Sequence, residues 1–126
     1  MRTRKQQAGF SLIEVTVTTV VISILATAAV PKYLGVQEDT KRATATGMAG
    51  ALGSASSANY VLRAGKGAGA PIADCTEVAT LMLPGAMTGF SIAPQAIPAG
   101  STATCTVDHN APGAATSATF IAHGVS

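Results

Sequence analysis

The stretch that decides the fold runs from Gly9 to Pro31 and reads GFSLIEVTVTTVVISILATAAVP. Between positions 10 and 30 it contains a single ionisable side chain, that of Glu14. As a helix, this segment would be about 31 Å long, close to the roughly 30 Å hydrocarbon core of a bilayer. The stretch is therefore long and apolar enough to span a membrane.

The charges around this segment predict its orientation. Three basic residues lie within the first five positions, whereas Lys32 alone directly follows the segment. Because positive charge is retained on the cytoplasmic side, we expect the N-terminus to be cytoplasmic and the remainder of the chain to be exported.

Glu14 and Gly9 distinguish this segment from an ordinary membrane anchor. A carboxylate inside an apolar helix costs up to about 3 kcal/mol on insertion scales, so Glu14 requires a compensating partner. Gly9 has no side chain and lets a protease approach the backbone closely. A cut after Gly9 would create an α-amino group on Phe10, which is positively charged at neutral pH. If copies of the helix pack with an axial offset, the Glu14 of one copy can meet the Phe10 amine of the next.

These residues resemble a known signature. A short basic leader ending in Gly9, then Phe10-Ser11-Leu12-Ile13-Glu14-Val15 and an apolar run closed by Pro31, is similar to the prepilin signature of type IV pilins and type II secretion pseudopilins. The resemblance covers roughly the first half of the chain. It implies cleavage by a prepilin peptidase between Gly9 and Phe10, N-methylation of Phe10, and assembly through Glu14.

A finer resemblance lies further along the chain. The segments 29–39, 47–52 and 59–60 are similar to pilins of the mannose-sensitive-haemagglutinin type. Beyond Tyr60 the resemblance is limited to the two cysteines.

Length and composition restrict what the exported part can be. A chain of 126 residues has room for one small domain besides the membrane helix, and a second domain is excluded. Without the first nine residues, five basic side chains remain against six acidic ones, so bulk charge does not support nucleic-acid binding. Small residues dominate the exported part, so its core should be thin and need a covalent staple.

Cys75 and Cys105 are the only cysteines, and both lie in the part expected to be exported. An even count in a small extracytoplasmic domain favours a disulfide over two free buried thiols. A zinc site would need further ligands, and His109 stands in no metal-binding pattern with the cysteines. We expect neither a metal nor a cofactor.

We expect three regions: a cleaved leader at 1–9, a transmembrane and assembly helix at 10–31, and a globular domain at 32–126. An ordinary secretory signal is the alternative for the first region, because Ala26-Thr27-Ala28 fits a small-residue cleavage site. Glu14 fits poorly in the apolar core of such a signal. Pro31 should kink or locally open the helix at the membrane surface.

The helix is expected to continue to about Arg63. One face, formed by Met48, Leu52, Ala55, Asn59 and Leu62, should cover a sheet. Gly47, Gly50 and Gly53 weaken helix propensity, so we interpret them either as sites of close backbone approach or as a bias to small residues.

The C-terminal part reads as short elements between turns. A glycine-rich loop at 65–71 ends the helix, and Cys75–Leu83 is either a short helix or a strand. Strands are expected at 90–93, 102–109 and 115–122, the last two joined by a turn at 110–113. The predicted fold class is α+β and pilin-like: a long N-terminal helix, amphipathic in its outer half, packed against a small antiparallel sheet.

No catalytic set emerges from the sequence, so we expect a structural protein and not an enzyme. The two histidines, His109 and His123, and the serines Ser101 and Ser117 lack any nucleophile context. The favoured interpretation is a subunit of a type IV pilus, polymerised through its N-terminal helix and serving adhesion, surface contact or motility. A pseudopilin of a type II secretion system and a membrane-anchored binding module are the alternatives.

This interpretation also predicts partners and locations. The partners would be other copies of the chain, a prepilin peptidase, the inner-membrane assembly machinery and, before assembly, the membrane itself. The precursor would lie in the bacterial inner membrane, and the product in an extracellular filament, or in the periplasm if the protein is a pseudopilin.

Overall fold

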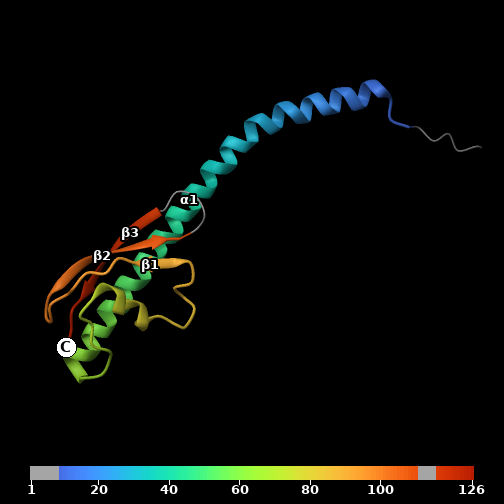
Figure 1. Ribbon diagram of the computed structural model, residues 1–126. Helices are drawn as coiled ribbons and strands as arrows, with labels where there is room; N and C mark the ends of the chain where they lie inside the picture. Colours follow the sequence, from blue (N-terminus) through green and yellow to red (C-terminus); the bar gives the residue numbers. More distant parts are fainter. Residues whose placement is uncertain (1–8, 111–115) are drawn as a thin grey trace, which may run out of the picture. The chain divides into compact units, whose positions relative to one another are not determined.

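The computed structural model describes residues 9–110 and 116–126. Its elements, in chain order, are helix α1 (Leu12–Lys66), the 3-10 helix η1 (Cys75–Leu81) and the strands β1 (Phe90–Ile92), β2 (Thr102–His109) and β3 (Thr116–His123) (Figure 1). The chain divides into two compact units, Met1–Val36 and Gln37–Ser126, and α1 contributes to both. We call residues 12–36 the N-terminal part of α1 and residues 37–66 its outer part.

The N-terminal part of α1 is apolar on all sides, and its side chains are exposed. It supplies the one helix among the described residues that is long and apolar enough to cross a membrane. Its hydroxyl groups bond back to helix carbonyls: Thr16, Thr18, Thr19 and Ser23 each donate to the carbonyl four residues earlier. Such bonds satisfy the hydroxyls within the helix. The helix assignment is uninterrupted at Pro31, and the kink or local opening expected there stays a prediction.

The outer part of α1 buries one face against the rest of its unit. The buried residues alternate at spacings of four and three, which places them on one side of a helix: Ala45, Ala49, Leu52, Ser56 and Asn59. This face is rotated from the predicted one. Met48 and Ala55 lie at its margin, half-buried, and Leu62 is 46% exposed. The expectation for Leu62 was wrong because the buried face is centred on Ala45, Ala49, Leu52, Ser56 and Asn59, and Leu62 lies outside it.

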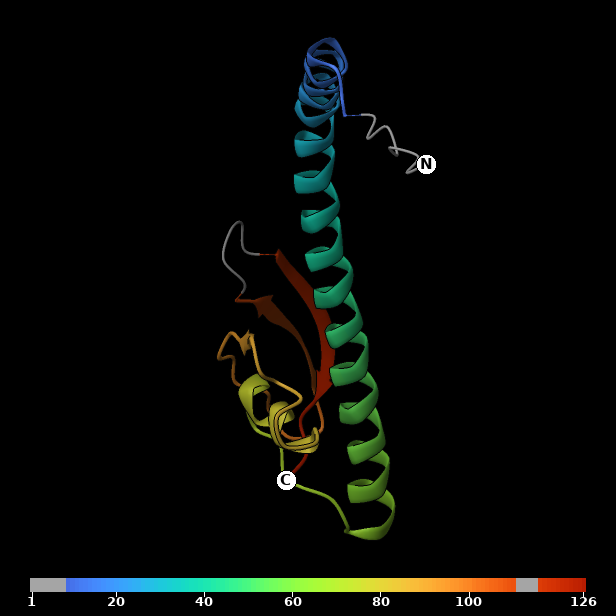
Figure 2. The same cartoon turned by 90° about the vertical axis from the view of Figure 1, so that its right-hand side faces the viewer.

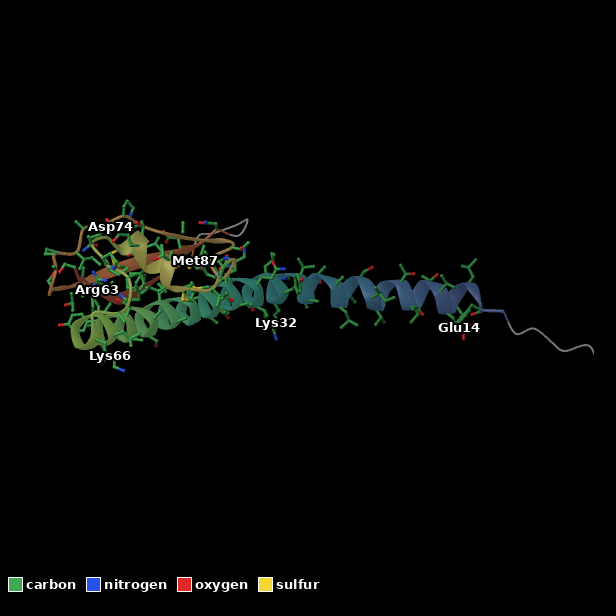
Figure 3. The ribbon with its side chains drawn as sticks, turned by 90° about the horizontal axis from the view of Figure 1, so that it is seen from below. Glu14, Lys32, Arg63, Lys66, Asp74 and Met87 are labelled. Atoms are coloured by element: carbon green, nitrogen blue, oxygen red, sulfur yellow. A yellow bond between two sulfur atoms is a disulfide. The ribbon has the colours of Figure 1, made fainter. Side chains whose placement is uncertain are left out.

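The C-terminal end of α1 is fixed by backbone and side-chain contacts. Gly67 has a φ of 64°, and its N–H donates to the Arg63 carbonyl at 3.0 Å, which closes the helix in a left-handed turn. The side-chain amide of the buried Asn59 donates to the Ala70 carbonyl and accepts from the Ala70 N–H, both at 2.8 Å. Arg63 donates to the Gly69 carbonyl at 3.0 Å, whereas Lys66 points away from the unit (Figure 3).

The three strands form an antiparallel sheet in the order β1-β2-β3. The β2–β3 ladder runs from Thr102 opposite His123 to His109 opposite Thr116. The strand positions confirm the sequence prediction to within one residue at each end. The turn predicted at 110–113 lies, beyond Asn110, outside the described residues.

The sheet packs on the outer part of α1, and β3 runs beside the helix (Figure 2). Leu52 from α1, Val107 from β2 and Phe120 from β3 belong to one buried cluster with both cysteines. Cys75 and Cys105 form a disulfide, with their Cα atoms 5.8 Å apart, and both residues are fully buried. The predicted pairing is confirmed, and it joins the start of η1 to the centre of β2.

Helix η1 settles the choice left open for Cys75–Leu83. The Asp74 side chain accepts from the Thr76 N–H at 2.9 Å, and the Glu77 carboxylate accepts from the Asp74 N–H at 3.2 Å. The two acidic residues thus form a capping box at the start of η1. Hydrogen bonds from the backbone N–H and the hydroxyl of Thr76 hold the pKa of Asp74 below its usual value. The lowered pKa stabilises the fold at neutral pH, and this contribution is lost in acid as Asp74 takes up its proton.

Candidate functional site

The start of α1 is built by a reciprocal pair of hydrogen bonds. The Ser11 N–H donates to the Glu14 carboxylate at 2.8 Å, and the Glu14 N–H donates to the Ser11 hydroxyl at 3.3 Å. This is a capping box, which satisfies two N–H groups that have no partner inside the helix. The Glu14 carboxylate also lies at the positive end of the helix dipole, which favours its negative charge. The capping box therefore gives Glu14 a role within a single copy of the chain.

Ser11 is the site residue that the sequence reasoning missed. A readable signal was present, because serine followed three residues later by glutamate and then an apolar run is the signature of a capping box. From the sequence, Glu14 was instead expected to make its contacts solely between copies of the chain.

Gly9 and Phe10 precede the helix and are exposed. A Cβ atom built on Gly9 would meet nothing within 4 Å, and its φ is not positive. No contact or backbone strain among the described residues therefore requires glycine at this position. Phe10 is 89% exposed and lines a shallow hollow with Ile13, Glu14 and Val17, at the helix start labelled by Glu14 in Figure 3.

The structure brings together some of the predicted site residues and separates others. Gly9, Phe10 and Glu14 lie within one turn of the start of α1. Pro31 lies further along the same helix. Cys75 and Cys105 belong to the other unit, where they support the core. Of the leader expected at residues 1–9, residues 1–8 lie outside the described residues.

The two histidines do not share a site. They end β2 and β3, respectively, at opposite ends of the ladder, because His109 is opposite Thr116 and His123 is opposite Thr102. The His109 ring meets the Phe90 ring edge-on at 4.9 Å. The His123 ring lies 5.2 Å from the Tyr60 ring and 3.3 Å from the Ser57 hydroxyl. Both side chains thus have structural contacts with neighbouring elements.

Comparison with known proteins yields one match. Residues 4–30 match the prokaryotic N-terminal methylation motif. No curated protein and no solved structure matches the chain. The detected similarity therefore covers only residues 4–30, which belong to the expected leader and to the N-terminal part of α1.

The matched motif covers the same residues that form the capped helix start. It supports a type IV pilin or pseudopilin, and it points to a structural protein and not to an enzyme. It also implies processing by a prepilin peptidase and assembly into a filament. Together with the apolar helix, it fits a precursor anchored in a membrane.

Proposed function

We propose that this chain is the structural subunit of a type IV pilus filament. It is made as a precursor in the bacterial inner membrane, cleaved between Gly9 and Phe10, methylated on Phe10 and polymerised through residues 10–31. The observation that carries the proposal is the coincidence of the methylation motif with an exposed apolar helix whose first turn holds a carboxylate.

The geometry at Glu14 supports pairing with a newly formed amine. In the precursor, the carboxylate is bonded to the neutral Ser11 N–H, and no cationic group among the described residues lies within ion-pair distance of it. Cleavage after Gly9 places a positive charge on Phe10, the residue next to that N–H. In the filament, the Phe10 amine of an adjacent subunit would neutralise Glu14 as the helix leaves lipid.

The exposed side chains of the N-terminal part of α1 support its role as the polymerisation element. Leu12, Ile13, Ile24 and Leu25 are each more than 60% exposed. Lipid would cover these side chains before assembly, and neighbouring helices would cover them afterwards. The threonines, whose hydroxyls are already bonded within the helix, allow such helix contacts without unsatisfied polar groups.

Two finer points belong to this proposal. The disulfide that ties the C-terminal sheet to η1 favours a pilin over a pseudopilin, because a cysteine-stapled C-terminal segment resembles the pilins more. The resemblance at segments 29–39, 47–52 and 59–60 further favours the mannose-sensitive-haemagglutinin type. Adhesion, surface contact or motility would then be properties of the whole filament.

Substitution of Glu14 tests the assembly mechanism. Removing one partner of a buried ion pair costs roughly 3–5 kcal/mol, which lowers the equilibrium constant of subunit addition by about two to four orders of magnitude. We expect Glu14→Ala to be exported and folded but to form few or no filaments in electron micrographs. Glu38→Ala, which removes an exposed carboxylate further along the same helix, is the matched control and should assemble normally.

Ser11→Ala distinguishes the helix-capping role of Ser11 from the proposed ion pair of Glu14 with the Phe10 amine. This variant removes the hydroxyl acceptor of the capping box but keeps the Glu14 carboxylate and the Ser11 backbone N–H. We expect it to assemble far better than Glu14→Ala. Wild-type filament yield in Glu14→Ala would show that pairing does not drive assembly.

Deletion of the gene distinguishes a pilus from a secretion pseudopilus. Loss of surface filaments with intact protein secretion is the expected result. Lost secretion with unchanged filaments would replace the pilus proposal by the pseudopilin one.

A further inference from the structure

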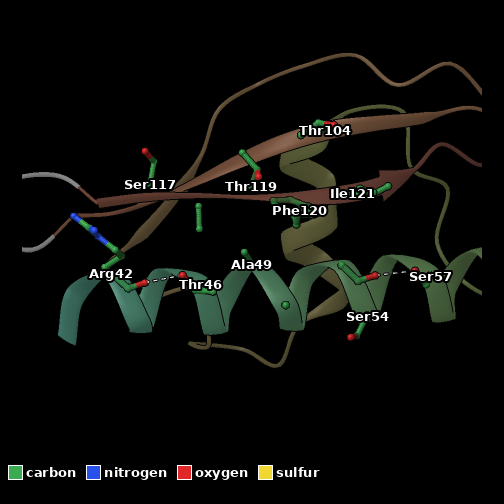
Figure 4. Close-up of a pocket in the computed structure, with 13 residues that line it drawn as sticks. Arg42, Thr46, Ala49, Ser54, Ser57, Thr104, Ser117, Thr119, Phe120 and Ile121 are labelled. Atoms are coloured by element: carbon green, nitrogen blue, oxygen red, sulfur yellow. Dashed lines mark hydrogen bonds between the residues drawn. The ribbon is translucent and has the colours of Figure 1, made fainter. Parts of the chain in front are cut away.

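An open groove of about 1010 Å³ separates the outer part of α1 from β3 (Figure 4). One wall is a flank of the helix from Arg42 to Ser57, and the other is β3 from Ser117 to Ile121. The helix flank is lined by small or hydroxyl-bearing residues, except for Arg42. The groove lies wholly within the unit Gln37–Ser126.

The wall formed by β3 is an unpaired strand edge. β3 has β2 on one side and no strand on the other among the described residues. The His123 N–H donates to the Ser56 hydroxyl at 2.9 Å, so the backbone N–H of His123 points away from β2. Because pointing direction alternates along an antiparallel strand, the N–H and C=O groups of Ser117 and Thr119 also point away from β2. An edge of this kind is a template for pairing with another extended chain.

The helix covers only part of this edge. A Cβ atom on Gly53 would lie 3.8 Å from the Ile121 carbonyl oxygen, so the helix approaches the edge closely there. A Cβ atom on Gly50, one turn earlier, would meet nothing within 4 Å. An added strand would lie about 4.8 Å from β3, and the missing side chain of Gly50 leaves room for it beside Ser117 and Thr119.

A positively charged side chain, that of Arg42, lines one end of the groove. Arg42 lines the groove, and its side chain points from α1 toward the end of β3 that carries Ser117 (Figure 4). Its guanidinium forms no ion pair with any residue that the structure describes; in particular, Asp108, the cross-strand neighbour of Ser117, does not reach it. A peptide that carries a carboxylate at this end would complement the charge.

We propose that this groove binds an extended, acidic segment of a partner protein, which joins the sheet as a fourth strand beside β3. Main-chain bonds to Ser117 and Thr119 would hold the segment, and Arg42 would select its carboxylate. The chain itself offers no such segment. Its six acidic residues lie on α1 (Glu14, Glu38, Asp39), in the cap of η1 (Asp74, Glu77) or on the middle strand (Asp108).

The test measures binding of short peptides to the full chain in detergent micelles. The probe is a capped hexapeptide of alternating valine and threonine in which one threonine is replaced by glutamate. Two control peptides carry glutamine in place of the glutamate, or N-methyl groups on the edge that would face β3. We expect the glutamate peptide to bind more tightly than the glutamine peptide, and the N-methylated peptide not to bind. Bound peptide should also slow amide hydrogen exchange at Ser117 and Thr119.

Matched variants assign the binding to the groove. Gly50→Leu fills the groove, whereas Gly47→Leu makes the same exchange at an exposed helical glycine outside it. We expect Gly50→Leu to weaken binding at least roughly ten-fold and Gly47→Leu to leave it unchanged. Arg42→Gln should abolish the preference for the glutamate peptide over the glutamine peptide, a difference in affinity of about three-fold for an exposed ion pair. Lys66→Gln, which removes a cation outside the groove, should preserve this preference.

Three results would overturn the proposal. The first is equal peptide affinity in Gly50→Leu and Gly47→Leu. The second is an unchanged glutamate preference in Arg42→Gln. The third is association of full-length copies through this groove, seen as complexes that Gly50→Leu disrupts and Gly47→Leu does not, because the occupant would then be a second copy of the chain.

Discussion

At the scale of single residues, neighbouring atoms restrict substitution at some glycines and not at others. Gly69 has a φ of 108°, and a Cβ atom there would lie 2.6 Å from the Asn59 side-chain oxygen. That oxygen accepts the Ala70 N–H, so Gly69 protects the contact that holds the loop on the helix. Gly9 is the opposite case, because nothing within the described chain requires it to be a glycine.

Gly69→Ala should therefore destabilise the fold more than Gly67→Ala. Both positions have positive φ, which costs alanine about 1–2 kcal/mol, but a Cβ on Gly67 meets nothing within 4 Å. Displacing the Asn59 amide adds the loss of buried hydrogen bonds, about 1–3 kcal/mol more. Thermal unfolding of the two variants in detergent, followed by circular dichroism, measures the difference. Equal melting temperatures would mean that the Asn59 contact does not stabilise the loop.

Gly9→Val should block processing. A branched side chain at Gly9 would keep a protease from the extended backbone, and the precursor would stay in the membrane. Mass spectrometry of the N-terminus is the measurement. Gly35→Val, a change at another open glycine of the chain, is the control and should be processed normally. Mature protein starting at Phe10 in Gly9→Val, or a wild-type N-terminus after Ala28, would contradict the assignment.

At the scale of elements, the disulfide connects parts that have few other contacts. It joins η1, a single short helix, to the middle strand of a three-stranded sheet across 30 residues of sequence. The buried cluster around it contains mostly small and medium side chains, with Leu52 and Phe120 among its larger members. A core of this size leaves a large share of the stability to the covalent link.

Cys105→Ser should accordingly lower the free energy of unfolding by roughly 3–4 kcal/mol, because closing a loop of this length restricts the unfolded chain by that amount. We expect a protease-sensitive C-terminal sheet, whereas the N-terminal part of α1 still inserts into the membrane. Limited proteolysis and a melting curve under non-reducing conditions measure both effects. An unchanged melting temperature would show that the core holds without the bridge.

At the scale of the whole molecule, the division into two units separates two kinds of surface. The unit Met1–Val36 exposes apolar side chains, and the buried cluster lies in the unit Gln37–Ser126. The second unit thus has a core and a disulfide of its own. The first unit needs lipid or other helices to cover its side chains.

The fragment 32–126 should therefore fold without the first 31 residues. We expect it to be monomeric, to contain the Cys75–Cys105 disulfide and to unfold cooperatively, since its buried residues all lie beyond Lys32. Size-exclusion chromatography and calorimetry of the exported fragment measure these properties. An aggregated fragment would place the domain boundary elsewhere.

The sequence alone determined the apolar helix, the strand positions and the cysteine pairing. These features depend on local composition, on residue spacing and on the even cysteine count, which are all readable along the chain. The capping box of Ser11 with Glu14 was equally readable but was overlooked. Pro31 carried a clear local signal, yet the helix continues through it.

Only the tertiary structure decided which face of α1 is buried and what the glycines do. The helix meets the sheet close to the edge of β3, where Gly53 approaches Ile121, so Ala45 and Ala49 are buried and Leu62 is not. Gly47 and Gly50 face open space and not a neighbouring backbone. Packing between segments some seventy residues apart fixes this rotation, because helical spacing predicts that a face exists but not where a distant strand will lie against it.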